Sequence, residues 1–145
     1  MAGTIREQGR IFAPIGEARV SAVDVRDVAA VACAALTEPG HEGRTYTITG
    51  PEAVTHAQIA SAIGAAVGKE VVFVDVPPDA FAAALKGVLP EWQLSGVVED
   101  YAHYARGEAS EVSPTVRDVT GHEARNVASF ARANASAFGG GDRPR

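Results

Sequence analysis

The sequence is poor in the residues that mark secreted, membrane and nucleic-acid-binding proteins. It has one cysteine, Cys33, so no disulfide can form within the chain, which fits a reducing compartment such as the cytoplasm. No apolar run approaches the roughly 20 residues of a membrane-spanning helix, and no secretory signal opens the chain. Basic residues number 13 against 18 acidic ones and form no cluster. We therefore expect a cytoplasmic protein that binds neither a membrane nor a nucleic acid.

Metal-binding and nucleophilic side chains are also sparse. His41, His56 and His122 lie in predicted turns or helix caps, and no cysteine or aspartate spacing completes a ligand set, so we expect no metal site. Alanines flank Cys33, which indicates a small buried side chain, because no basic neighbour would lower the pKa of its thiol. Any chemistry must come from other polar residues.

The composition that remains is that of a globular domain. Apolar residues make up 46% of the chain and charged residues 21%, and many of the apolar residues are alanine. A chain of 145 residues forms one ordinary domain. We expect this domain over residues 1–138, followed by a flexible glycine-rich tail over 139–145.

Hydrophobic periodicity predicts alternating strands and helices in the first half of the chain. Residues 4–12 are predicted as a loop with a short strand, 20–24 as a strand, 26–36 as a helix and 45–49 as a second strand. Thr55 and Gln58 then have the spacing of a capping box, which predicts a helix that starts there and ends at Gly68.

The second half is predicted to be mostly helical. A third strand covers residues 71–76, and helices follow over 79–86, over 90–106, for a turn or two after 114 and from 126 onward. The expected fold class is α/β, with short three-stranded, partly parallel sheet elements, flanking helices and a helical C-terminal part.

Three charged residues mark the junction between the first strand and its helix. Asp24, Arg26 and Asp27 can cap and pair within the helix end, which is a purely structural role. They can also line a substrate site, because ligands of α/β proteins gather at the carboxyl ends of strands. Both interpretations remain open from the sequence.

The helix over 90–106 carries the densest group of chemically active side chains. Glu99 and His103 are four residues apart, as are Asp100 and Tyr104, so each pair can touch on one helix face. A histidine held by a carboxylate can act as a general base, and a tyrosine beside it as an acid. The same residues can simply form a solvated helix face. Trp92, the only tryptophan, is a candidate substrate contact on this helix.

Several segments together resemble the NmrA-like atypical short-chain dehydrogenases. They are VDVRDVA (23–29), EPGHEGRTYTITGPEA (38–53), VDVPP (74–78), PEW (90–92) and YARG (104–107). That family consists of NAD(P)-binding proteins that include quinone and triphenylmethane reductases and redox-sensing regulators. The resemblance runs over nearly the whole chain and implies the C-terminal, substrate-binding half of such a protein.

The resemblance also implies that the dinucleotide-binding half is absent. The glycine-rich loop of that half needs a strand, a G-x-G-x-x-G turn and a helix, whereas Gly139 to Gly141 follow a helix and precede a polar tail. Tyr46 is not followed four residues on by lysine, so the Tyr-x-x-x-Lys pair of typical short-chain dehydrogenases is missing. We therefore expect no cofactor-binding residues here, and NAD(P) only if a partner chain supplies the missing half.

A predicted strand without neighbouring strands in this chain indicates that another chain pairs with it. In the family, the strand from Thr45 to Thr49 resembles the last strand of a large sheet whose other strands this chain lacks, while the strands over 20–24 and 71–76 resemble a small parallel pair. Because an open strand edge is a template for pairing, we expect a homodimer, or a complex with another partner, built across Thr45 to Thr49.

Three functions follow from these observations. The first is a stand-alone truncated domain that binds a small organic molecule and acts without a cofactor, as a proton-transfer isomerase or cyclase of secondary metabolism. The second is one half of an NAD(P)H-dependent oxidoreductase, inactive alone. The third is a non-catalytic regulator or scaffold.

Overall fold

The structure is a computed structural model that describes residues 2–140. Its elements in chain order are α1 (Ala2–Gln8), β1 (Arg10–Ala13), β2 (Arg19–Val20), α2 (Val25–Thr37), β3 (Val54–Thr55), α3 (His56–Val67), β4 (Val72–Asp75), α4 (Pro78–Leu85), α5 (Glu91–Ala105), α6 (Thr115–Thr120), α7 (Val127–Ala133) and the 3₁₀ turn η1 (Ala135–Phe138). Among residues 2–140, no helix combines the length and the hydropathy needed to cross a bilayer.

The main body is a helical layer packed on a small parallel sheet. Strands β1 and β4 pair in parallel, from Arg10 opposite Val72 to Ala13 opposite Asp75. Helix α3 covers this pair and also contacts α7 and η1. Their apolar side chains form the larger core cluster, which consists of Ile5, Ile11, Ala60, Ile63, Val71, Ala131 and Phe138. Burial of this cluster fixes the position of the first turn of α3.

A second small sheet continues from this body. Strands β2 and β3 pair antiparallel, with Arg19 opposite Thr55 and Val20 opposite Val54. Val20 packs with Ala13 and Ile15 in a second core cluster, to which Tyr101 and Tyr104 of α5 contribute partly buried rings. This cluster joins α5 to the start of α3.

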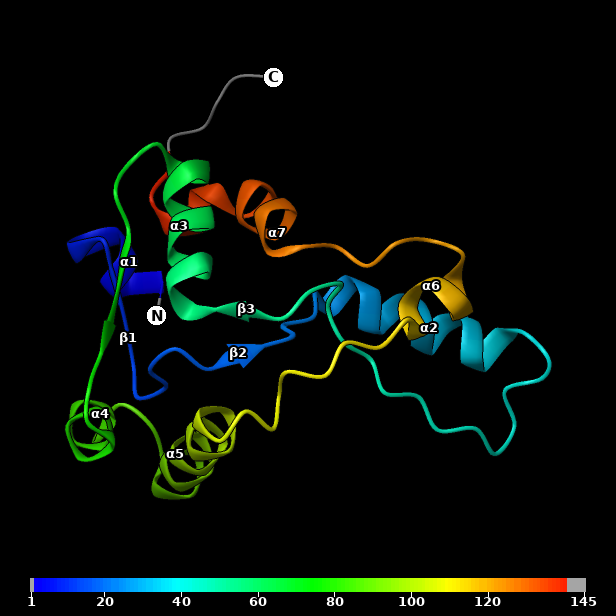
Figure 1. The fold of residues 1–145 in the computed structure, drawn as a ribbon, viewed down its shortest axis with the longest axis horizontal. Coiled ribbons are helices and arrows are strands. Elements are labelled where there is room, and N and C mark those ends of the chain that lie inside the picture. Colours follow the sequence, from blue (N-terminus) through cyan, green and yellow to red (C-terminus); the bar gives the residue numbers. More distant parts are fainter. Residues whose placement is uncertain (1, 141–145) are drawn as a thin grey trace.

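Helices α2 and α6 form an arm that extends to one side of the main body (Figure 1). The buried Asp27 on α2 accepts hydrogen bonds from the backbone N–H and the guanidinium of Arg125, which ties the arm to the start of α7. The outer surface of α2 is poorly covered, since Val25 is 74% exposed and Leu36 86%.

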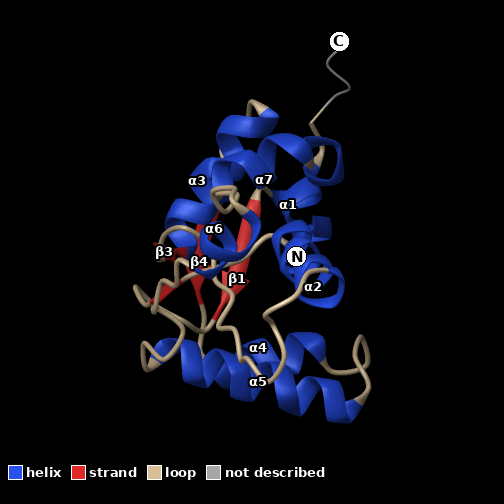
Figure 2. Ribbon diagram, turned by 90° about the vertical axis from the view of Figure 1, so that its right-hand side faces the viewer, coloured by secondary structure: helices blue, strands red, loops and turns tan. Residues whose placement is uncertain are grey.

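Helices α4 and α5 lie together at the end of the molecule away from α3 and α7 (Figure 2), and neither contains a buried residue.

The helix predictions are confirmed in detail. Helix α3 has the expected capping box, because the Thr55 hydroxyl accepts from the Gln58 N–H and the Gln58 side chain accepts from the Thr55 N–H. It ends at Gly68 in the left-handed conformation, with φ of 72°. Helices α2, α4, α5 and α6 begin and end within two residues of the expected bounds, while the single helix expected from 126 onward is divided into α7 and the 3₁₀ turn η1.

The strand predictions are partly wrong. The expected three strands are four, in two separate pairs, and residues 45–49 form no strand. The parallel partner of β4 is β1, not the strand expected over 20–24, which is reduced to β2 and pairs antiparallel with β3. Strand pairing depends on distant partners, which local alternation does not reveal. Residues 4–12 were predicted as a loop with a short strand; the strand corresponds to β1, but helix α1 was missed.

Two further expectations concern Cys33 and the tail. Cys33 is exposed on α2, so its prediction as a buried side chain is wrong. The reason is that α2 packs mainly against α6, which leaves part of its alanine-rich surface open. In the expected tail, Gly139 ends η1 with φ of 87°, while residues 141–145 lie outside the described part of the chain.

Candidate functional site

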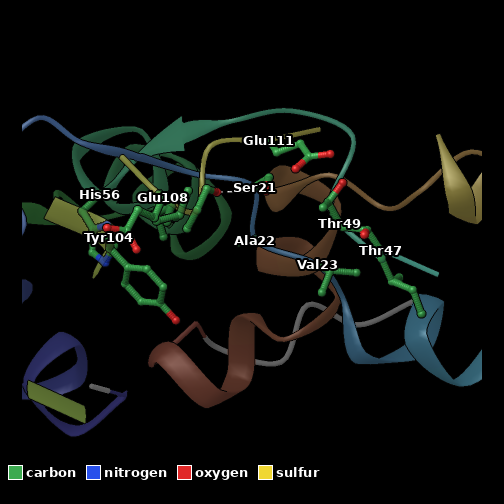
Figure 3. Close-up of a pocket in the computed structure, with 13 residues that line it drawn as sticks. Ser21, Ala22, Val23, Thr47, Thr49, His56, Tyr104, Glu108 and Glu111 are labelled. Carbon is green, nitrogen blue, oxygen red and sulfur yellow. Dashed lines mark hydrogen bonds between the residues drawn. The ribbon is translucent and has the colours of Figure 1, made fainter. Parts of the chain in front are cut away.

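A cavity of about 480 Å³ lies between the end of β2 with the segment that follows it, the start of α3 and the end of α5 (Figure 3). Its walls come from four segments that are far apart in the sequence, namely residues 20–23, residues 47–49, His56 with Ile59, and Tyr104 with Glu108, Ala109 and Glu111. Most of this lining is apolar. A cavity with mainly apolar walls and a few converging polar groups is the usual form of a small-molecule site.

One wall depends on a close backbone approach at Gly50. Its N–H donates to the Ser21 carbonyl at 3.0 Å, and a side chain there would place Cβ 2.1 Å from the Ala22 carbonyl oxygen. Only glycine allows this contact. The approach holds residues 47–49 against residues 21–23, so that both segments face the same space.

The opposite wall is held by α5 and the residues that follow it. The Ser21 N–H and hydroxyl both donate to the Ala109 carbonyl, at 2.8 and 3.0 Å. The Thr49 hydroxyl accepts from the Ser113 N–H at 2.8 Å. These bonds fix the segment after α5 over the cavity, with Glu108 and Glu111 in its lining.

His56 is one of the cavity residues that the sequence did not single out, as are Glu108 and Glu111. It was read as a helix-cap residue, yet it is only 6% exposed and its ring lies between Phe73 and Tyr101, at centroid distances of 5.5 and 5.9 Å. Burial lowers the pKa of the imidazole, which favours its neutral form. The capping box did place His56 at the first position of α3, but its burial depends on rings from β4 and α5.

Tyr104 is the member of the predicted acid–base group that reaches the cavity. Its ring is partly buried and packs edge-on against Tyr101 at 5.6 Å. In Figure 3 the phenol extends into the open space beside His56. Burial raises the pKa of the neighbouring Tyr101, with a smaller contribution from Tyr104. Tyr101 does not line the cavity itself but packs behind His56 and Tyr104, and its raised pKa keeps it protonated at neutral pH.

The other members of that group lie outside the cavity lining. His103 Nδ1 is 2.5 Å from Glu108 Oε2, and the Arg106 Nε donates to Glu108 Oε1 at 2.6 Å. The hydrogen bonds from Arg106 and then His103 hold the pKa of Glu108 at about 2. Glu99 approaches His103 to 3.9 Å, as its spacing predicted. Asp100 makes no hydrogen bond or ion pair with Tyr104 in the described structure, so the four residues do not form one cluster.

At the strand-to-helix junction, Asp24 pairs with Arg26 and caps α2. Asp24 is 5% exposed, caps α2 through the Arg26 N–H and also accepts from the Arg26 guanidinium at 2.9 Å. This pairing lowers the pKa of Asp24 to about 2 and raises that of Arg26. Asp24 borders a smaller cavity of about 180 Å³.

Trp92 is 75% exposed and does not line the larger cavity. A substrate role for Trp92 and for the residues of the junction stays a prediction.

No metal-binding cluster is present among residues 2–140, in the sense of three or more His, Cys, Asp or Glu side chains that converge. The expectation of a protein without a metal stays a prediction.

Comparison with known proteins finds that this chain is similar to reductases. No protein-family model matches the chain. It is 43% identical over 139 residues to an NAD(P)H azoreductase of Xenophilus azovorans, covering 95% of this chain and 49% of that protein. It is 37% identical over 134 residues to a (4-alkanoyl-5-oxo-2,5-dihydrofuran-3-yl)methyl phosphate reductase of Streptomyces griseus, covering 92% and 48%.

Solved structures agree with these relatives. The crystal structure of an NADPH-dependent quinone oxidoreductase of Escherichia coli complexed with NADPH superposes with a TM-score of 0.83 at 28% identity, covering 91% of this chain and 47% of that one. The chain thus spans about half the length of the relatives it matches. This fits the expected C-terminal half of an NmrA-like reductase.

The relatives correct one expectation. A protein that works without a cofactor was predicted, but the homologues are NAD(P)H-dependent oxidoreductases, and one is solved with NADPH bound. The cofactor-independent isomerase or cyclase has no support from them. The prediction was wrong because it considered the half present and not the chemistry of the whole family.

The cavity residues nevertheless do not fit the pyrophosphate of a nicotinamide dinucleotide. Its charged lining residues are Glu108 and Glu111, both acidic. The two nearest helix N-termini, which can bind phosphate through free N–H groups, are capped by Asp24 and Thr55. Phosphate-binding residues must therefore come from elsewhere than this cavity.

Proposed function

We propose that this chain is the substrate-side half of an NmrA-like, NAD(P)H-dependent oxidoreductase, and that its cavity receives the organic electron acceptor. The observation that carries the proposal is the 43% identity to the NAD(P)H azoreductase, which extends over 95% of this chain but only 49% of that protein. The contribution of this half is to bind and orient the acceptor between Tyr104, His56 and the 47–49 segment.

Two surface features support the proposal that another domain or chain covers part of this one. Val25 and Leu36 of α2 are exposed apolar side chains. The backbone N–H and C=O groups of residues 45–48 make no hydrogen bond within the described structure. Exposed apolar patches and unpaired strand-like edges are typical of surfaces that another chain or domain covers. We assign this surface to the dinucleotide-binding half.

Complementation tests the proposal. The part of the Xenophilus azovorans azoreductase that this chain does not match, called the complementing half below, is co-expressed with this chain. NAD(P)H oxidation is then followed with a quinone or an azo dye as acceptor. We expect turnover by the purified complex and none by either half alone. A purified complex that binds NADPH but neither binds nor reduces any acceptor would contradict the proposal.

A second proposal concerns the same edge. Two copies of the chain can pair through residues 45–49, since this edge is open in a single copy. Light scattering coupled to size-exclusion chromatography distinguishes whether this edge binds a second copy of the chain or the complementing half. A dimer of this chain at micromolar concentration supports self-pairing, and its replacement by a one-to-one complex with the complementing half supports the reductase assembly.

A further inference from the structure

A buried imidazole without a hydrogen-bond partner forms part of the cavity wall. His56 is 94% buried, and its Nδ1 atom is fully buried with no partner in the described structure. Buried polar groups are normally satisfied, so an orphaned one at a cavity needs an explanation. His56 is also the first residue of α3, held by the Thr55 capping box, so its backbone position is well fixed.

The two ring nitrogens have different surroundings. Nδ1 is fully buried, whereas Nε2 also lacks a partner in the described structure but is not among the fully buried atoms. A neutral imidazole carries one N–H and one lone pair. Because orphaned N–H groups are rarer in protein interiors than orphaned acceptors, we assign the proton to Nε2. The accessible nitrogen is then a donor, and the space it can reach is the cavity that His56 lines.

A second free donor lies on the same side of the cavity. The Tyr104 hydroxyl has no hydrogen-bond partner among the described residues, although its ring is partly buried. Tyr101 packs edge-on against both rings, at 5.9 Å from His56 and 5.6 Å from Tyr104, and so fixes their spacing. Figure 3 shows both side chains at one end of the cavity, opposite Thr47 and Val23.

We propose that the His56 Nε2–H and the Tyr104 hydroxyl form a donor pair that selects an uncharged, planar aromatic ligand with oxygen acceptors, such as a quinone, over a hydrocarbon of the same shape. The proposal rests on the proposed function for the acceptor site and adds its specificity-determining residues. The Ile59 and Val20 side chains supply apolar contact, while Glu108 and Glu111 disfavour anions. A hydrogen-bonding site rejects ligands that lack the matching acceptor, because its polar groups then stay unpaired.

Equilibrium titration of the full chain with two probes tests the pair. The probes are menadione and 2-methylnaphthalene, which share a ring system but differ in the two carbonyl oxygens. We expect His56→Phe to weaken menadione binding about tenfold and to leave 2-methylnaphthalene unchanged, the size of effect that one lost hydrogen bond produces. Tyr104→Phe should act in the same direction, and His56→Gln should restore part of the discrimination because its amide is also a donor.

Matched controls separate recognition from folding. His122→Phe alters an exposed histidine outside the cavity and should change neither affinity. His56→Phe should melt at or above the wild-type temperature, because it replaces an unsatisfied polar ring by an apolar one between Phe73 and Tyr101. If that variant fails to fold, Tyr104→Phe and His56→Gln still decide the question.

The outcomes distinguish this inference from the proposed function. Equal menadione affinity in wild type, His56→Phe and Tyr104→Phe overturns the donor pair, and so does an equal loss for both probes. If the wild type still binds menadione and the complex with the complementing half still reduces it, the proposed function stands without the donor pair. A wild type that binds neither probe overturns the donor pair, and it overturns the proposed function as well if the complex with the complementing half reduces no acceptor.

Discussion

Asp24 illustrates how a single residue at the edge of the site stabilises the fold. Its carboxylate caps α2 and pairs with Arg26, which lowers its pKa from 3.8 to about 2. A carboxyl with a lowered folded pKa stabilises the protein above its unfolded pKa, and this contribution is lost as pH falls from about 4 through about 2. The segment that leads into α2 forms a wall of the cavity, so this pairing also holds the site.

Asp24→Asn should therefore destabilise the protein in a pH-dependent way. Asparagine keeps the cap, so the loss reports the charge pairing, about 1–2 kcal/mol at pH 6 after allowance for the exposure of Arg26. The difference from wild type should shrink toward zero near pH 2. Urea unfolding at a series of pH values measures it. Asp100→Asn, at an exposed carboxylate, is the control and should have no effect at any pH. A constant difference across pH would contradict the assignment.

Among the elements, the 47–49 segment owes its position to Gly50 more than to regular hydrogen bonding. Adding a Cβ at Gly50 would place it 2.1 Å from a backbone oxygen, which no side-chain movement relieves. Gly50→Ala should thus cost about 2 kcal/mol or more and weaken acceptor binding by displacing one cavity wall. Gly96→Ala is the matched control, because Gly96 lies mid-helix in α5 with nothing within 4 Å. It should raise stability by about 0.5–1 kcal/mol and leave binding unchanged. Urea unfolding and menadione titration check both.

Helices could be predicted from the sequence because their signals are local. The Thr55 and Gln58 spacing, the Gly68 stop and the Asn126 cap all act within a few residues, and each is found where expected. The strands could not be predicted in full, since β1 needs β4 from far along the chain. Residues 45–49 have strong strand propensity, but the described structure offers them no neighbouring strand.

In the candidate site, too, the residues set by local signals could be predicted and those set by tertiary packing could not. Tyr104 was named because its helix could be read, and it does line the cavity. His56 was missed because its role depends on Phe73 and Tyr101, which only the tertiary packing brings to it. The Glu99 and His103 pair could be foreseen from helical spacing, whereas the stronger contact of His103 with Glu108 arises after the helix ends. Local rules thus find candidate groups, and packing decides which of them share a cavity.

On the scale of the whole molecule, the α2 arm exposes apolar side chains and the 45–49 edge exposes backbone polar groups, both of which folded proteins usually cover. Helix α2 packs mainly on α6, and its apolar residues Val25 and Leu36 remain exposed. The matched relatives are about twice as long as this chain. We infer that the arm is an interface whose apolar face is buried by the dinucleotide-binding half.

Leu36→Glu should therefore disrupt that assembly without unfolding the chain. Burying a leucine contributes about 1.5–3 kcal/mol, so replacing it by a charge should weaken binding of the complementing half at least about tenfold. NADPH-dependent acceptor reduction should fall in parallel at limiting concentration and recover when the complementing half is in excess. Val88→Glu is the control, because Val88 is 71% exposed in the turn between α4 and α5, away from the arm. Analytical ultracentrifugation measures both affinities. Equal binding by wild type and Leu36→Glu would show that the two halves meet elsewhere.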